Sequence, residues 1–144
     1  MDTANEVPRT SIKVIAYNCW GIKWISQYRS ERFQEIGNSL AASQPDIVGL
    51  QECFTQADFD AIHSRTLHIL PYAKRYFSGA FGCGLAILSR WPIEESSMIP
   101  YPLNGRPTAF YRGDWYVGKG IAHARIRIGP AVRDIVEVFC THVG

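Results

Sequence analysis

Two polar side chains stand directly after short apolar runs, a pattern typical of a site at the edge of a β-sheet. Glu52 closes such a run, in which residues 47–50 predict a strand buried on both faces. Asn18 follows the run at 12–17. A carboxylate at the exit of a buried strand costs free energy unless it has a partner, and a metal ion is one such partner. Taken alone, Glu52 is equally well interpreted as an ordinary acid that caps a helix or pairs with a lysine.

The segment between these residues predicts that they meet. Residues 30–43 repeat apolar side chains at helical spacing, with Ser30 as the expected N-cap, and Pro45-Asp46 opens the second strand. A strand–helix–strand unit of this length is typical of a crossover between parallel strands. Parallel neighbours end at the same sheet edge, about 4.8 Å apart, so Asn18 and Glu52 are expected to face one ligand. Their oxygens together favour a hard cation such as Mg²⁺.

The remaining elements predict an α/β domain. A second helix is expected after a Thr-x-x-Asp capping box at Thr55 and Asp58. Beyond Pro71 the pattern changes to strands, which we expect at 73–77, 83–89, 93–99, 120–128 and 134–141. The last strand runs into Thr141 and His142. A lone histidine is more often structural than catalytic, but its place at a strand end raises the chance of a site role.

A glycine-rich segment at 113–120 matches most of a Walker A loop, Gly-x-x-x-x-Gly-Lys. A nucleotide-triphosphatase site is rejected, because Gly120 replaces the Ser or Thr that would ligate Mg²⁺ and because the following residues alternate like a strand. Two interpretations stay open. The segment is either a plain hairpin, or it lets Lys119 reach a phosphate with Asp114 as its charge partner.

Composition sets the class of protein. The 144 residues, 47% hydrophobic and 19% charged, are typical of one modest globular domain, and the net charge of +2 is too small to indicate nucleic-acid binding. No apolar run approaches the roughly 20 residues of a membrane span, and residues 1–10, the expected disordered leader, lack the layout of a secretory signal. The four cysteines show no Cys-x-x-Cys spacing, so we expect them reduced and mostly buried, as in an intracellular protein.

Aromatic residues cluster just after Asn18, at Trp20, Trp24 and Tyr28. We interpret them as packing residues, with a lipid interface or substrate stacking as the alternative. The three histidines upstream of His142 have no partner that the sequence identifies, and they are interpreted as structural: His63, His68 and His123.

These motifs together resemble the endonuclease/exonuclease/phosphatase superfamily. The resemblance is carried in order by Asn18, by Gln51-Glu52, by Gly-Leu-Ala-Ile-Leu-Ser-Arg-Trp-Pro-Ile at 84–93 and by Thr141-His142. Within it, Asn-Cys-Trp-Gly-Ile at 18–22 and Asp-Trp-Tyr-Val-Gly-Lys-Gly at 114–120 are similar to neutral sphingomyelinases, above all the fungal inositol phosphosphingolipid phospholipases C.

The resemblance implies a DNase I-like fold, a two-sheet α/β sandwich with outer helices, and a Mg²⁺-dependent phosphodiesterase. Glu52 would bind the metal with Asn18 beside it. His142 would contact the phosphate or assist the leaving alkoxide, and Lys119 would add charge at the phosphoryl oxygens in a switch with Asp114. The implied substrate is a sphingolipid at a membrane, with an anionic phospholipid as a candidate activator and no nucleic acid. The full-length protein would be membrane-associated, and no protein partner can be inferred.

The sequence also departs from that family. Cys140 stands where nuclease relatives often carry Asn, and the family's Asp-x-Asn pair and terminal Asp-His do not occur. Residues 11–144 are therefore interpreted as the N-terminal part of a catalytic domain about twice as long, inactive alone, with one sheet's inner face uncovered. The alternatives are another superfamily member, either a nuclease or an inositol-polyphosphate phosphatase, and an inactive truncated pseudo-domain. A nuclease would need no Asp–Lys switch at 114–120. The genomic sequence after Gly144 would distinguish a truncated enzyme from an inactive pseudo-domain.

Overall fold

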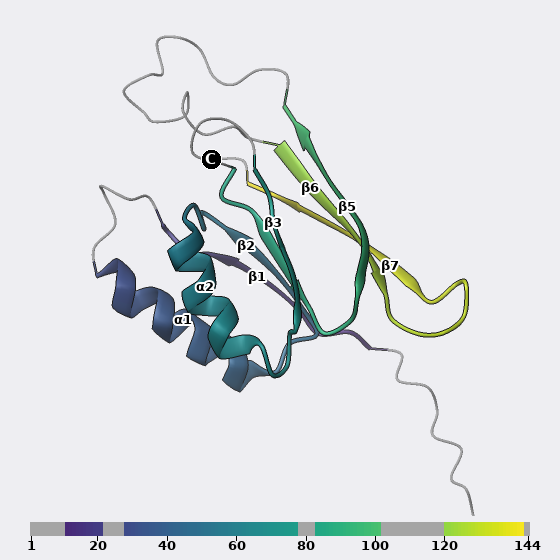
Figure 1. Ribbon diagram of the computed structural model, residues 1–144, viewed down its shortest axis with the longest axis horizontal. Coiled ribbons are helices and arrows are strands. Elements are labelled where there is room, and N and C mark those ends of the chain that lie inside the picture. The colour runs from purple at the N-terminus through teal and green to yellow at the C-terminus, as the bar shows by residue number, and fades with distance from the viewer. Residues whose placement is uncertain (1–10, 22–27, 78–82, 102–119, 143–144) are drawn as a thin grey trace, which may run out of the picture.

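A computed structural model describes residues 11–21, 28–77, 83–101 and 120–142 and folds them into two stacked β-sheets with two helices on one outer face (Figure 1). The elements in chain order are β1 (Val14–Asn18), α1 (Arg29–Ser43), β2 (Ile47–Gln51), α2 (Gln56–Thr66), β3 (Tyr72–Arg75), β4 (Ala86–Ser89), β5 (Ile93–Pro100), β6 (Gly120–Arg127) and β7 (Ile135–Thr141). The strands expected from the sequence are confirmed within a few residues at each end. The expected leader, 1–10, lies outside the described residues.

The first sheet has the order β1-β2-β4-β3. β1 and β2 are parallel neighbours, with Asn18 opposite Gln51, as the strand–helix–strand unit predicts. β4 runs antiparallel to both β2 and β3, so β3 runs in the same direction as β1 and β2. The carboxyl ends of β1, β2 and β3 therefore lie along one edge of the sheet, which we call the site edge.

Helices α1 and α2 begin at the site edge and cover the outer face of the first sheet (Figure 1). α1 buries the four residues that its spacing predicts, Phe33, Ile36, Gly37 and Leu40. Ser30 is not its N-cap, because the helix starts one residue earlier at Arg29, after Tyr28 in a left-handed conformation. The cap of α2 is confirmed: the Thr55 hydroxyl accepts from the Asp58 backbone amide at 3.1 Å.

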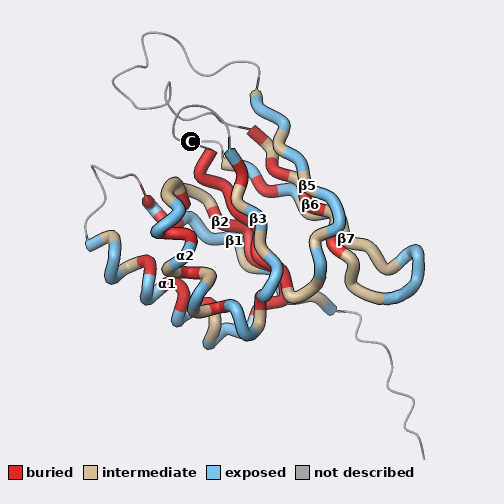
Figure 2. Tube along the Cα trace, viewed as in Figure 1, coloured by how far each residue is buried: buried red, intermediate tan, exposed pale blue. Residues whose placement is uncertain are grey.

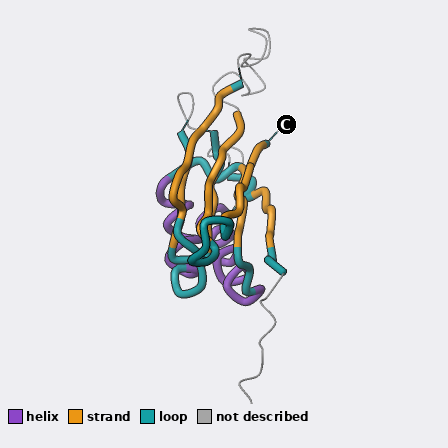
Figure 3. The backbone as a smooth tube through the Cα atoms, turned by 90° about the vertical axis from the view of Figure 1, so that its right-hand side faces the viewer, coloured by secondary structure: helices purple, strands orange, loops and turns teal. Residues whose placement is uncertain are grey.

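The second sheet has the antiparallel order β5-β6-β7 and packs on the inner face of the first. β6 alternates buried and half-buried residues, as its sequence predicts. The small residues Ala122 and Ala124 let this strand approach Ile87, and the cluster they form joins the two sheets. Seen from the side, the strands occupy the face toward the viewer and the helices lie behind them (Figure 3).

The sequence predicts that one sheet's inner face is uncovered, and the packing of the two sheets confirms this prediction only in part. β7 faces β2, β6 faces β4 and β5 faces β3, so the two inner faces largely cover each other, and the buried residues gather between them and under the helices (Figure 2). The inner face stays open at β1, where Val14, the register partner of Ile47, keeps 59% of its surface in solvent. Among the described residues, no helix is long and apolar enough to cross a membrane.

Candidate active site

The backbone brings the residues after β1 against the residue after β2. The Cys19 amide donates to the Gln51 carbonyl at 2.8 Å, and the Gly21 amide donates to the Glu52 carbonyl at 2.9 Å. A Cβ on Gly21 would lie 2.2 Å from the Glu52 carbonyl oxygen, so only glycine allows this approach. Glu52 itself has a φ of 55°, which turns the chain off β2 at this point.

The Asn18 side chain is oriented by its own loop. Its Oδ1 accepts from the Trp20 backbone amide at 2.9 Å, which directs its Nδ2 toward Glu52. Nδ2 donates to Glu52 Oε1 at 3.1 Å. In this geometry Asn18 fixes the carboxylate, and a direct role of Asn18 as metal ligand stays a prediction.

His142 reaches the same carboxylate from the second sheet. β7 ends at Thr141, and His142 Nε2 lies 3.2 Å from Glu52 Oε1. The three residues that the sequence singles out at strand ends, Asn18, Glu52 and His142, thus meet around one oxygen atom. Lys119 and Asp114 lie outside the described residues, so their predicted roles stay predictions.

The second oxygen of Glu52 has a different environment. Oε2 is buried and has no hydrogen-bond partner among the described residues. Leaving a buried acceptor unsatisfied costs about 1–3 kcal/mol, and more for a charged group. An oxygen ligand of this kind fits a hard cation, which commonly takes one or two protein carboxylates and fills its other positions with water or phosphate.

Two arginines that the sequence analysis did not single out hold the backbone on either side of this site. Arg32 on α1 donates to the carbonyls of Cys19 at 2.6 Å and Trp20 at 2.8 Å. Arg75 at the end of β3 donates to the Phe54 carbonyl at 2.8 Å, two residues beyond Glu52. Main-chain oxygens occur at every residue and leave no signal in the sequence, and Arg75 also donates to the Gln56 side chain at 2.8 Å.

The cysteines beside the site are neutral packing residues. All four are free and buried, as expected. Burial raises the pKa of Cys53 to about 12 and raises the pKa of Cys19 still further, so neither thiol supplies a nucleophile at neutral pH. The Cys140 thiol accepts from Gln51 Nε2 at 3.5 Å and links β7 to β2 just before His142 and Glu52.

The predicted packing role of the aromatic residues after Asn18 is wrong where the structure describes them, whereas a structural role fits His63. Trp20 and Tyr28 are 46% and 79% exposed, so their interpretation as packing residues is wrong, and Trp24 lies outside the described residues. His63 contacts the Leu70 carbonyl at 3.1 Å, which fits a structural role. His123 pairs with Glu137 on the outer face of the second sheet, a partner that the sequence did not identify.

Comparison with known sequences places this geometry in a family context. Residues 15–139 match the Endonuclease/Exonuclease/phosphatase family. The chain is 48% identical over 132 residues to an inositol phosphosphingolipids phospholipase C of Schizosaccharomyces pombe, covering 92% of this chain and 31% of that protein. It is 30% identical over 132 residues to sphingomyelin phosphodiesterase 2 of Homo sapiens, covering 92% of this chain and 30% of that protein. The chain therefore spans about a third of these relatives.

Solved structures share the fold. A sphingomyelinase C from Streptomyces griseocarneus superposes with a TM-score of 0.70 at 22% identity, over 92% of this chain and 49% of that one. A beta toxin variant from Staphylococcus aureus with bound magnesium ions gives a TM-score of 0.72 at 21% identity, over 92% of this chain and 49% of that one. At these identities the likeness shows the fold, a two-sheet DNase I-like sandwich of which this chain spans about half.

Proposed function

The chain belongs to the endonuclease/exonuclease/phosphatase family, and from that premise we propose that it carries part of the site of a Mg²⁺-dependent phospholipase C acting on sphingolipids. The substrate class rests on the relatives, which are named for phosphosphingolipid and sphingomyelin hydrolysis. We further propose that this site works at a membrane surface, where such substrates reside.

The observation that carries the proposal is the unequal use of the two Glu52 oxygens. Oε1 contacts Asn18 and His142, whereas Oε2 is buried without a partner among the described residues. These residues fit a divalent cation, with Glu52 Oε2 as the ligand oxygen that the described residues offer. When bound there, Mg²⁺ would supply Lewis-acid polarisation of a phosphoryl oxygen and stabilise the charge that develops on it.

The other residues of the site have supporting roles in this proposal. Asn18 holds Glu52 in one orientation through Oε1 and leaves Oε2 without a partner among the described residues. His142, 31% exposed, lies against Glu52 through Nε2, and the rest of its ring is available to a phosphate oxygen or to the leaving alkoxide. Lys119, with Asp114 as its charge partner, is proposed to add positive charge at the phosphoryl oxygens.

Metal binding by the chain itself tests the site without requiring turnover. Calorimetric titration with Mg²⁺, and Mn²⁺ binding followed by electron paramagnetic resonance, should detect a site in the wild type and none in Glu52→Gln. Glu35→Gln is the matched control, since it removes the same charge from an exposed position on α1. Equal affinity in the wild type and Glu52→Gln would remove Glu52 from the metal site.

Turnover is tested in a chimera. Since the chain spans 31% of the Schizosaccharomyces pombe relative, we expect no hydrolysis from the chain alone and hydrolysis when the chain replaces the matching segment of that relative. The assay is Mg²⁺-dependent release of the phosphorylated head group from inositol phosphosphingolipids or sphingomyelin. Hydrolysis by the purified chain alone would contradict the expected dependence on further residues.

A further inference from the structure

Two exposed aromatic rings lie at the site edge, one on each side of Glu52. Trp20 follows β1 and is 46% exposed, and Phe77 follows β3 and is 67% exposed. Since β1, β2 and β3 run in the same direction, both rings lie at the edge where Glu52 leaves β2. Exposed apolar rings cost free energy in water and are typical of surfaces that meet a partner.

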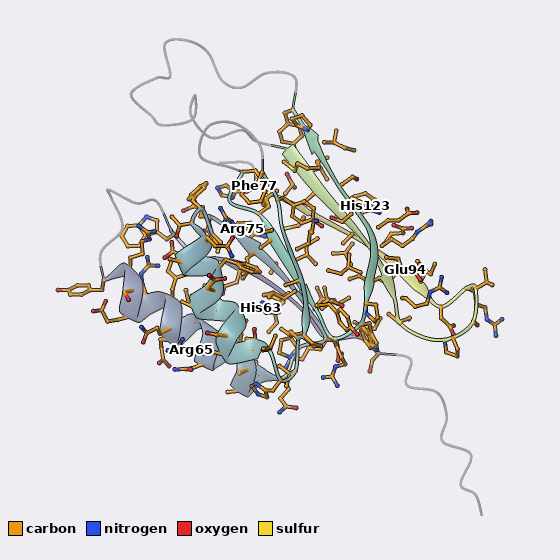
Figure 4. The ribbon with its side chains drawn as sticks, viewed as in Figure 1. His63, Arg65, Arg75, Phe77, Glu94 and His123 are labelled. Atoms are coloured by element: carbon orange, nitrogen blue, oxygen red, sulfur yellow. The ribbon has the colours of Figure 1, made fainter. Side chains whose placement is uncertain are left out.

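Each ring is stacked on an arginine that also binds the backbone of the site. The Arg32 guanidinium lies 5.0 Å from the Trp20 ring centre and donates to the Trp20 carbonyl at 2.8 Å. The Arg75 guanidinium lies 4.6 Å from the Phe77 ring centre and donates to the Phe54 carbonyl at 2.8 Å. Figure 4 shows Arg75 and Phe77 together at the end of β3, away from Arg65 and His63 on α2.

This arrangement points to a lipid surface. Aromatic rings are favoured at the boundary between the acyl chains and the head groups of a bilayer. Arginines beside the rings suit the same boundary, because their charge complements lipid phosphates.

We propose that Trp20, Arg32, Arg75 and Phe77 form a docking rim that rests this edge on the head-group boundary of a phospholipid bilayer. The proposal rests on the proposed function, which supplies a lipid substrate. The arginines join the rim to the loops that carry Asn18 and follow Glu52, so docking places the site at the depth of a lipid phosphodiester. The stacked arginines hold both rings in place before contact, which lowers the ordering cost of binding.

Vesicle binding tests the rim separately from catalysis. The chain is sedimented with phosphatidylcholine vesicles, with and without phosphatidylserine, in the presence of EDTA and without sphingolipid. Trp20→Ala and Phe77→Ala together should lower the partition coefficient by about tenfold, which corresponds to about 0.7 kcal/mol for each exposed ring. Tyr72→Ala is the matched control, an aromatic residue 42% exposed at the opposite end of β3, and should bind as the wild type does.

Contact with lipid is checked directly. Lipids brominated along the acyl chain should quench the fluorescence of the wild type more than that of Trp20→Ala, which retains the other three tryptophans. Circular dichroism of each variant controls for folding. The proposed docking role of the rim would be overturned by any of three results. These are unchanged partitioning of the folded double variant, an equal loss of partitioning in Tyr72→Ala, and absent quenching.

A second comparison separates the rim from the proposed function. In the chimera, Phe77→Ala should hydrolyse a short-chain monomeric substrate at the wild-type rate and vesicle substrate about threefold more slowly, since loss of one ring lowers partitioning by that factor. Equal rates on both substrates would overturn the rim while leaving the hydrolase intact. Absence of hydrolysis in the wild-type chimera would overturn the proposed function, whereas the vesicle partitioning would still decide the rim.

Discussion

Two histidine–glutamate pairs on this chain differ in whether the glutamate keeps an oxygen without a partner among the described residues. At the site edge, His142 and Asn18 both contact Oε1 of Glu52, while Oε2 is buried and unpartnered within the described part of the chain. On the outer face of the second sheet, Glu137 uses both oxygens: Oε2 contacts His123, and Oε1 accepts from Arg125 at 2.7 Å. The Glu52 side chain is 14% exposed and that of Glu137 is 37% exposed.

The contrast distinguishes the candidate site at Glu52 from the exposed hydrogen-bond network at Glu137. Glu137 is satisfied by neighbours on its own sheet, so its pair with His123 needs nothing further and is screened by solvent. Oε2 of Glu52 is buried and has no hydrogen-bond partner among the described residues, and burying a polar atom without a hydrogen bond costs free energy. A buried acceptor without a partner among the described residues supports the proposal of a ligand at Glu52, whereas the presence of a His–Glu pair alone does not.

The largest expected difference between the two pairs is in catalysis. In the chimera, Glu52→Gln should lower kcat/KM for the sphingolipid by about a hundredfold to a thousandfold, because several kcal/mol of charge stabilisation are lost with the metal ligand. Glu137→Gln should stay within about twofold of the wild type, since an exposed pair contributes little to a distant site. Mg²⁺-dependent head-group release measures both. A similar loss in the two variants would break the comparison.

The next difference lies in how neighbours orient each glutamate. Asn18→Ala removes the amide that fixes Glu52, and we expect the Mg²⁺ affinity to fall by about tenfold to a hundredfold, as is usual when a group that orients a ligand is lost. Ser97→Ala removes the hydroxyl 3.5 Å from His123 Nδ1 and should leave Mg²⁺ affinity unchanged. Calorimetric titration of the two variants gives the comparison. If Asn18→Ala bound Mg²⁺ as tightly as the wild type, Asn18 would have no part in the site.

The sequence predicted the site edge because its signals are local. Asn18 and Glu52 each end an apolar run, and the helix between them dictates parallel strands, so their meeting follows from topology. The position of His142 beside Glu52 was harder to predict, because it depends on the packing of β7 against β2. That packing involves side chains from both sheets. The bonds of Arg32 and Arg75 to main-chain carbonyls left no signal, since every residue carries a carbonyl. The unused oxygen of Glu52 is likewise a property of packing.

The smallest expected difference is the pH dependence of the outer pair. The His123 hydrogen bond, and after it the Arg125 bond, hold the pKa of Glu137 below its usual 4.5. A carboxyl with a lowered pKa stabilises the fold above its unfolded pKa and loses that contribution as the pH falls through the folded value. The stability gap between the wild type and Glu137→Gln, measured by urea unfolding, should therefore be present near neutral pH and close below about pH 4. Added salt should shrink the gap at neutral pH, because the pair is exposed, and added Mg²⁺ should leave it unchanged apart from that screening, because both Glu137 oxygens are engaged. A gap that widened in acid would contradict the lowered pKa of Glu137. A gap that responded to Mg²⁺ beyond an equal ionic strength of sodium chloride would show that Glu137 also holds an unused acceptor. The two glutamates would then differ less than their contacts indicate.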